Sequence, residues 1–414
     1  MRNMNGTSGN HAMTDKTLKG PLNGLKVIEL GNLVAGPFCT RLLAEFGAHV
    51  VKIELPNEGD PIRKWRILDD TGTSYWWYVQ SRNKKCITLD CRQPEGLRIL
   101  KLLVRDVDVL VENFRPGTLD KWGLTAQALK ELNPKLIISR ISGFGQDGPY
   151  KDRAAFGAIA EAMSGLRYIT GYPDRPPTRV GISLGDSIAA LYSVIGILMA
   201  LYHRDVKGGP GQEVDVALSE AVFSLMESMV TEYDQKGFIR ERTGSALPGI
   251  VPSNAYPTKE GGFVVIAANG DAIVRRLLGA MCRKDLMEDP RWATNDVRVT
   301  HAEAIDKVIG AWTVGLTLDD CLERLNAAGV PAARIYNVAD IVQDPQYQAR
   351  QMILEIEHPG LGLVKVPGIV PKLSETPGAV KWLGPAMGEH NMEVLKNIGL
   401  TDAQIEAMRS KGII

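Results

Sequence analysis

The sequence lacks the residue spacings on which most metal sites and disulfide frameworks depend. Its five cysteines are an odd number and include no Cys-x-x-Cys pair. Its six histidines include no His-x-x-x-His or His-Glu-x-x-His spacing. These absences argue against a disulfide-stapled domain, so we expect neither a structural nor a catalytic metal.

The sequence also lacks an excess of either charge, because 48 Lys and Arg balance 48 Asp and Glu in 414 residues. A neutral chain has no overall field to attract nucleic acid or an anionic membrane, so we expect neither as a partner. Gly, Ser, Tyr or charged residues interrupt the apolar runs, and we expect no membrane-spanning segment. Residues 1–20 are polar without an apolar core, which predicts a disordered leader and a cytoplasmic protein.

The common nucleotide-binding motifs are missing or incomplete. Gly31–Gly36 follows the first expected strand, where Gly-x-Gly-x-x-Gly would indicate dinucleotide binding, but the middle position is Leu33. Glu54, at the end of the second strand, is therefore expected to be a solvated carboxylate and not a ribose ligand. The sequence has no Gly-x-x-x-x-Gly-Lys-Ser/Thr loop and no Gly-x-Ser-x-Gly elbow.

What the sequence does contain is an alternation of short apolar strands and helices. Strands are predicted at 25–30, 49–55, 86–89, 107–111, 136–141 and 213–216, and helices at 36–47, 94–104 and 126–132. This alternation predicts an α/β fold with a Rossmann-like, doubly wound parallel sheet, whose ligands bind beyond the carboxyl ends of the strands.

The length of the chain predicts two domains. The composition changes after Gly237, where glycine, proline and serine become frequent. We expect a leader at 1–20, the N-terminal part of a large domain at 21–239, a smaller α/β domain at 240–340, and a return segment at 341–414 that completes the large domain.

Asp186 is a lone carboxylate between two uncharged stretches, at the start of a long apolar run that predicts a buried helix. An ionised group there must find donors, raise its pKa or be used in chemistry. Its position is typical of a helix N-cap, and it is equally a candidate catalytic carboxylate.

Several phrases along the chain together resemble the class III CoA-transferase family, which includes formyl-CoA transferase, carnitine CoA-transferase and the related α-methylacyl-CoA racemases. The phrases lie at 21–30, 35–37, 47–54, 59–63, 83–85, 111–117, 141–145, 185–186 and 388–390. Each phrase alone is weak, but their number and order support a resemblance that covers residues 21–414.

The resemblance implies a homodimer of two interlocked subunits, each with a large CoA-binding domain built from both chain ends. It also implies that Asp186 is the catalytic nucleophile, which attacks the donor thioester and becomes an aspartyl-CoA thioester. Coenzyme A and acyl-CoA would be substrates, with no tightly bound cofactor. By matching motif positions, the expected CoA contacts are Val34, Ala35, Lys84, Lys85, Leu89, Arg92, Asn113, Phe114, Arg115 and Lys121.

The sequence is similar to that of the succinyl-CoA-dependent branch of the family. We therefore expect a succinyl-CoA donor and a small carboxylic acid as acceptor, such as glutarate, itaconate or mesaconate. Arg63, Arg179 and Arg242 are candidates for the distal carboxylate, although surface salt bridges explain them as well.

Two other functions stay open at this point. A racemase of the same fold uses a histidine some thirty residues before the aspartate, but the corresponding stretch Arg153–Ala158 has none. A non-catalytic acyl-CoA-binding protein would keep the fold without the reaction.

Overall fold

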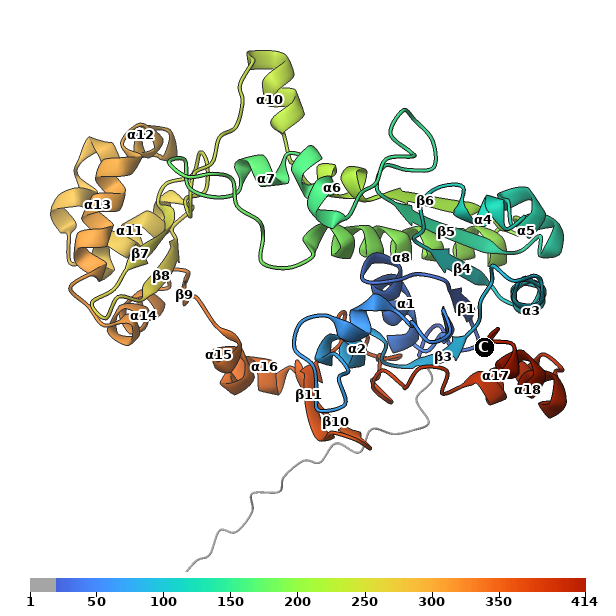
Figure 1. Ribbon diagram of the computed structural model, residues 1–414. Helices are drawn as coiled ribbons and strands as arrows, with labels where there is room; N and C mark the ends of the chain where they lie inside the picture. Colours follow the sequence, from blue (N-terminus) through green and yellow to red (C-terminus); the bar gives the residue numbers. More distant parts are fainter. Residues whose placement is uncertain (1–19) are drawn as a thin grey trace, which may run out of the picture. The chain divides into compact units, whose positions relative to one another are not determined.

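The computed structural model describes residues 20–414, so the expected leader lies outside the described residues except for Gly20. The described chain divides into two compact units (Figure 1). The first contains residues up to 160 together with 183–222 and 352–414, and the second contains 161–182 and 223–351. The second unit is thus larger than the expected 240–340, because segments on both sides of 183–222 pack together in a way that composition does not reveal.

A six-stranded sheet forms the centre of the first unit, with the strand order β3-β2-β1-β4-β5-β6 and every neighbouring pair parallel. The strands are β1 Lys26–Glu29, β2 His49–Glu54, β3 Lys84–Thr88, β4 Val109–Glu112, β5 Ile137–Ser142 and β6 Glu213–Ala217. This confirms the predicted parallel α/β sheet. The order reverses between β1 and β4, and ligands of doubly wound sheets bind in the crevice beyond this point.

Helices cover the sheet, and the C-terminal segment returns to it (Figure 1). The elements with most of their residues in this unit are α1 Ala35–Glu45, η1 Pro61–Lys64, α2 Tyr75–Gln80, α3 Pro94–Val104, α4 Thr118–Lys121, α5 Ala126–Leu132, α6 Gly157–Met163, α8 Leu184–Asp205, α9 Leu218–Phe223, the hairpin β10 Ile353–His358 and β11 Gly362–Pro367, α17 Asn391–Asn397 and α18 Asp402–Ser410. The return segment contributes Val394, Leu395 and Ile405 to the same apolar core as Ile28 and Leu110.

Helix α8 packs against α1, β5 and β6 and presents its other side to the surface. It has 22 residues and a mean hydropathy of 1.8 over its most apolar stretch, which by length and composition alone would suffice to cross a bilayer. This differs from the expectation that every apolar run is too short. A single helix of this kind is weak evidence for a membrane span, because a core helix passes the same test.

The second unit has its own three-stranded antiparallel sheet, in the order β7-β8-β9. Its strands are β7 Ser253–Pro257, β8 Phe263–Ala267 and β9 Ala332–Arg334. Its helices are α7 Leu166–Ile169, α10 Met229–Lys236, α11 Asp271–Ala280, η2 Lys284–Met287, η3 Pro290–Trp292, α12 Asn295–Thr300, α13 Ala302–Thr313, α14 Leu318–Ala327, α15 Val338–Gln343 and α16 Pro345–Ala349. A separate apolar core that includes Trp292, Ile309 and Leu325 holds this unit together.

Candidate active site

Two loops meet beyond the carboxyl ends of β1 and β4, where the strand order reverses. The first runs from Gly31 to Val34 and the second begins at Asn113. The Asn113 side chain bridges them, because its Nδ2 donates to Asn32 O at 2.9 Å and its Oδ1 accepts from Asn32 N at 2.8 Å. Gly31 gives the Asn113 side chain room, since a Cβ on it would lie 3.0 Å from Asn113 Oδ1. The predicted ligand loops of the sheet are therefore joined to each other.

Asp186 lies in the first turn of α8 and is half-buried. The N-cap is Ser183, so the interpretation of Asp186 as the cap is wrong by three residues. In the first turn the carboxylate is close to the positive end of the helix dipole, which favours a negative charge. The helix position therefore stabilises an ionised Asp186 without using its side chain as the cap.

Asp186 lines a cavity of about 130 Å³ in the first unit. The loops after β1, β4 and β5 supply most of the wall. The residues that line it include Asn32, Leu33, Val34, Ala35, Asn113, Phe114, Arg115, Gly143, Arg153, Phe156 and Asp186. The structure thus brings five of the expected contact residues, Val34, Ala35, Asn113, Phe114 and Arg115, to the same cavity as Asp186.

Helix α6 approaches the carboxylate so closely that its first residue has no room for a side chain. A Cβ built on Gly157 would lie 2.3 Å from Asp186 Oδ2 and 3.0 Å from its Cγ. Contacts below 3.0 Å do not occur between real atoms of this kind. Gly157 therefore leaves space for the Asp186 carboxylate, a role that the sequence did not indicate.

The amino terminus of α1 reaches the same cavity. Val34 is its N-cap, Ala35 is its first residue, and no side chain caps the first turn. Backbone N–H groups at a helix start are donors with a positive dipole behind them. The cavity therefore has the starts of two long helices, α1 and α8, in its wall, an arrangement suited to negative charge.

A second cavity, of about 240 Å³, adjoins the first and shares Asn32 and Phe114 with it. Leu89 and Arg92, both expected CoA contacts, line this cavity. Its wall also contains Trp122, whose ring packs edge-on against Phe114 with centroids 5.6 Å apart. Arg92 Nε donates to Asp90 Oδ1 at 2.8 Å, and the Arg92 side chain is 60% exposed. Seven of the ten expected contacts thus line one of the two adjoining cavities.

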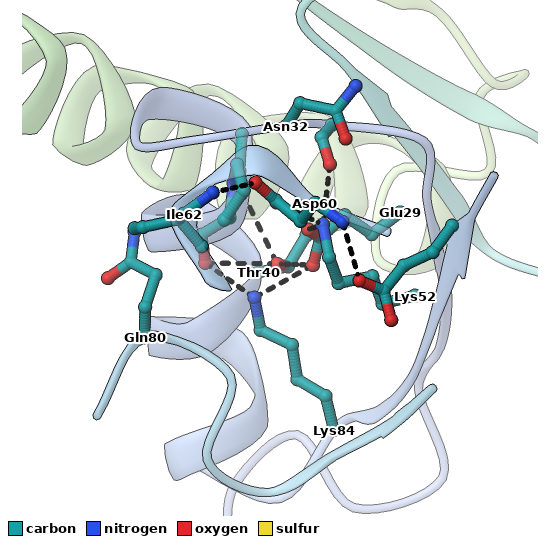
Figure 2. A network of polar contacts seen from close by, with 12 residues as sticks. Glu29, Asn32, Thr40, Lys52, Asp60, Ile62, Gln80 and Lys84 are labelled. Carbon is teal, nitrogen blue, oxygen red and sulfur yellow. Dashed lines mark hydrogen bonds and ion pairs between the residues drawn. The ribbon is translucent and has the colours of Figure 1, made fainter. Parts of the chain in front are cut away.

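Lys84 lines neither cavity, and its burial corrects the expectation that it contacts CoA. Its side chain is fully buried, and its Nζ donates to Glu29 Oε2 at 2.8 Å and to Pro37 O at 2.7 Å. Figure 2 shows it directed into a network with Glu29, Thr40 and Lys52. Burial alone would raise the pKa of Glu29, but Lys52 and Lys84 lower it to about 2.

Lys85 and Lys121 are also outside the two cavities. Lys85 forms an ion pair with Glu393 of the return segment and lines a different cavity, of about 410 Å³, together with Lys26 and His49 from the amino ends of β1 and β2. Since ligands bind at the carboxyl ends, this places Lys85 at the opposite edge of the sheet. Lys121 is exposed at the end of α4.

Glu54 and Arg63 form a buried pair instead of the solvated carboxylate and the substrate-binding cation considered from sequence. Arg63 Nη2 lies 2.7 Å from Glu54 Oε2, and the Arg63 guanidinium lies 3.4 Å from the centroid of the Trp77 ring. Arg63 is therefore not available for a distal carboxylate. Arg179 and Arg242 belong to the second unit, where Arg242 Nη1 donates to Tyr168 O at 2.8 Å.

Glu112 supports the second loop from the end of β4. Its Oε2 accepts from Phe114 N at 2.7 Å, and the side chain is buried. Burial raises the pKa of Glu112 to about 7, although the Phe114 N–H and Arg140 act in the opposite direction. The loop that carries Asn113 is thus attached to a carboxyl group that titrates near neutral pH.

Sequence reasoning missed Leu33, Asp60 and Arg153. Leu33 has a φ of 65°, in the left-handed region, and lines the Asp186 cavity. Asp60 accepts from the Leu33 N–H, and Arg153 lines the cavity from the loop after β5. The one available signal was the phrase at 59–63, which contains Asp60. Within residues 20–414, no group of three His, Cys, Asp or Glu side chains could hold a metal ion.

The comparisons with known proteins agree on one family. The sequence profile of CoA-transferase family III matches residues 22–391. The chain is 50% identical over 395 residues to the succinyl-CoA–D-citramalate CoA-transferase of Chloroflexus aurantiacus, covering 95% of this chain and 98% of that protein. It is 42% identical over 398 residues to the beta subunit of the succinyl-CoA–L-malate CoA-transferase of the same organism, covering 95% and 98%. The crystal structure of a CAIB/BAIF family protein from Brucella suis matches with a TM-score of 0.81 and 34% identity, over 92% of this chain and all of that one.

Proposed function

The chain belongs to CoA-transferase family III, and we propose that it moves CoA from succinyl-CoA to a small dicarboxylate through a covalent intermediate on Asp186. The observation that carries this proposal is the place of Asp186. It lies in one cavity with the start of α1 and with the two loops at the reversal point of the sheet. Ligands of doubly wound sheets bind at this reversal point, and Asp186 provides a carboxylate in the cavity at that place.

The reaction needs two acyl exchanges. The Asp186 carboxylate attacks the succinyl-CoA carbonyl, which releases CoA thiolate and leaves a mixed anhydride. The thiolate then attacks the aspartyl carbonyl of the anhydride, which releases succinate and leaves the aspartyl-CoA thioester. The acceptor carboxylate attacks this thioester, and the released thiolate takes the acceptor acyl group, which regenerates the carboxylate. No ATP and no tightly bound cofactor is required.

The surroundings of Asp186 suit this chemistry. Each attack places a negative charge on a carbonyl oxygen, and donors that are already oriented stabilise that charge most effectively. The first-turn N–H groups of α1 at Val34 and Ala35 are the candidate donors. The half-buried position of Asp186 removes part of the water that weakens a carboxylate nucleophile.

The second cavity fits the nucleotide end of CoA. Leu89 and the Phe114–Trp122 pair offer apolar surface to an adenine ring, and Arg92 offers a cation to a phosphate. The shared residues Asn32 and Phe114 connect this cavity to the one with Asp186. We therefore assign Val34, Ala35, Asn113 and Arg115 to the pantetheine end and Leu89 and Arg92 to the nucleotide end.

Arg153 is our candidate for the distal carboxylate of the donor and acceptor acids. It lines the Asp186 cavity, and its guanidinium lies 3.6 Å from the centroid of the Tyr150 ring. A stacked guanidinium keeps its outer N–H groups free to bind a carboxylate with two hydrogen bonds. The names of the relatives favour D-citramalate and L-malate as acceptors to test before glutarate, itaconate and mesaconate.

The runner-up function is an acyl-CoA racemase that uses Asp186 as an acid or base. Proton exchange at the α-carbon needs a second titratable group on the other side of the substrate. The described residues that line the cavity include no histidine, and the stretch that carries it in racemases has Phe156 and Gly157 instead.

We further propose a homodimer that acts in the cytoplasm. On α8, Leu191, Ile195, Leu198, Met199 and Tyr202 are 42–67% exposed and lie on one face, which is a large apolar surface for a lone chain. All five cysteines are free and four are buried, which suits a reducing compartment. Light scattering that reports a monomer would remove the dimer from the proposal.

The direct test of the function is an exchange assay. The purified chain is incubated with succinyl-CoA and one dicarboxylate at a time, and new acyl-CoA species are detected by mass. Transfer to at least one of the five named acids is the expected result. Deuterium uptake from solvent at the α-carbon of a 2-methylacyl-CoA without transfer would favour the racemase, and CoA binding without either reaction would favour a binding protein.

A further inference from the structure

The conformation of Leu33 is unusual for a residue of its type. The described chain contains seven non-glycine residues with positive φ, and of these only Leu33 lines the cavity with Asp186. The left-handed region is unfavourable for a side chain with a Cβ, and such residues persist only where the surroundings hold them. Something in the first unit must therefore hold Leu33 in this conformation.

The loop around Leu33 is held at four successive residues. The Leu33 N–H donates to both carboxylate oxygens of Asp60, at 3.0 and 3.1 Å. Lys52 Nζ donates to Gly31 O at 2.6 Å, and Gln80 Nε2 donates to Val34 O at 3.1 Å. With the two Asn113 bonds to Asn32, each residue from 31 to 34 has a backbone group bound by a distant side chain.

Asp60 is the group that acts on Leu33 itself, and its own position is tightly defined. It is fully buried, Lys52 Nζ lies 2.8 Å from its Oδ2, and Ile62 N donates to its Oδ1 at 2.9 Å. Lys52 also pairs with Glu29 at 2.8 Å. Figure 2 shows Glu29, Lys52, Asp60 and Ile62 joined in one set of contacts. The carboxylate therefore cannot turn away from Leu33 without losing a buried ion pair.

The direction of the chain at Leu33 decides where α1 begins. Val34, the N-cap, and Ala35, the first helical residue, come directly after Leu33 and line the cavity with Asp186. If Leu33 relaxed to a right-handed conformation, the N–H groups of this helix start would move relative to Asp186. Displacements of this size matter most in the transition state, because the donors must meet a developing charge.

We propose that Asp60 is a positioning residue for CoA transfer, which holds Leu33 in the left-handed conformation and so aims the start of α1 at the reacting carbonyl. Lys52 fixes the orientation of Asp60. This inference rests on the proposed function, because it assigns the α1 donors to the transfer reaction. Asp60 itself does not touch the substrate.

The test compares Asp60→Asn with the double variant Asp60→Asn/Leu33→Gly in the exchange assay. The amide keeps the shape of the side chain but loses the charge that binds Lys52 and one of the two acceptors for the Leu33 N–H. We expect kcat to fall by about 30-fold while KM for succinyl-CoA changes less than about threefold. Glycine adopts the left-handed conformation without strain, so the double variant is expected to recover at least about threefold in kcat.

The matched control is Asp69→Asn. Asp69 is also a buried aspartate of the first unit, and it accepts from Thr71 N, Thr73 N and Tyr78 Oη–H without lining either cavity. Its variant is expected to lose stability but to keep kcat within about twofold once folded. A fall in kcat that also occurs in Asp69→Asn would assign the Asp60 effect to general loosening and would overturn the proposal.

A second variant keeps the proposal testable if Asp60→Asn does not fold. Leu33→Val keeps an apolar side chain in the cavity wall, but a β-branched residue resists the left-handed conformation more strongly than leucine. We expect a loss of about fivefold or more in kcat with Asp60 intact. Full kcat in Leu33→Val, or no recovery in the double variant, contradicts the proposal. Absence of transfer by the wild-type chain would instead contradict the proposed function.

Discussion

Replacing Gly157 by alanine tests the site without removing the carboxylate on which the reaction depends. The new methyl group would lie 2.3 Å from Asp186 Oδ2. An ordinary contact is about 3.4 Å, so the carboxylate must withdraw by roughly 1 Å. The three atoms nearest to this Cβ all belong to Asp186, two in its side chain and the third, at 3.3 Å, its backbone N. The end of a side chain can rotate away, so we expect the fold to accept the change.

A misplacement of this size in a reacting group costs up to about 100-fold in rate, which corresponds to about 2.7 kcal/mol of transition-state stabilisation. We therefore expect kcat for exchange to fall by about 100-fold in Gly157→Ala, with KM for succinyl-CoA nearly unchanged. Alanine favours helix over glycine by up to about 1 kcal/mol, so the free energy of unfolding should change little. Steady-state kinetics and urea denaturation of the same sample separate the two effects.

The control is Gly310→Ala, a helical glycine of α13 whose added Cβ would meet nothing within 4 Å. It should leave both kcat and KM at their wild-type values. An exchange rate within twofold of wild type in Gly157→Ala would refute the reasoning, because the carboxylate that the methyl group displaces would then not be the reacting group.

Three further predictions concern other parts of the first unit. Burial raises the pKa of Glu112 from an ordinary 4.5 to about 7, so its contribution to stability is present below pH 4.5 and is lost as the pH rises through 7. By linkage this loss is about 3 kcal/mol. Glu112→Gln should therefore flatten the decline of the free energy of unfolding, measured with urea, between about pH 5 and 8. Lys52→Met removes the buried ammonium group that pairs with both Glu29 and Asp60. This should lower the free energy of unfolding by about 3–5 kcal/mol, because two buried carboxylates lose a partner. A loss below about 1 kcal/mol would show that these ion pairs contribute little to stability. Arg92→Ala should raise KM for succinyl-CoA by about fivefold at low salt without lowering kcat, and an unchanged KM would place the CoA phosphates elsewhere.

The strands and helices around the sheet were predictable because their patterns are strong. All four residues of β4, Val109–Glu112, are buried, and the apolar run before Glu112 is what a central parallel strand requires. The sequence also predicts a helix at 402–411 with Thr401 as its cap, and helix α18 has this cap together with a capping box to Gln404. After the strand at 213–216 the sequence predicts one long helix to about Gln235, but the structure has two helices, α9 and α10, separated at residues 224–228.

The interior polar network was not predictable from local sequence. Lys52, Lys84 and Glu29 stand on three different strands, and nothing near any one of them indicates that its partner lies on the next strand. Lys84 is expected to contact CoA from its place in the family motif, and lysines are seldom fully buried unless paired, so its buried ion pair with Glu29 has no signal in the local sequence. The conformation of Leu33 has the same cause, because leucine has no local preference for it and Asp60 imposes it from 27 residues away.

Asp186, in contrast, could be identified as a candidate catalytic residue from the sequence, because it is the only carboxylate between two uncharged stretches and matches the nucleophile of the family that the chain resembles. The structure adds what surrounds it, namely Gly157, the start of α1 and the loop bridge at Asn113. These come from segments up to about 150 residues apart, and only the topology of the sheet brings them together.

The central claim is that Asp186 becomes covalently bonded during the reaction, and chemical trapping measures this directly. The chain is mixed with succinyl-CoA, treated with hydroxylamine or borohydride, digested, and its peptides are mapped by mass. The account predicts a hydroxamate or a reduced side chain at Asp186 and at no other residue, both in the wild-type chain and in Gly310→Ala. Trapping at a different residue, or an unmodified Asp186 in a preparation that exchanges CoA, would contradict it.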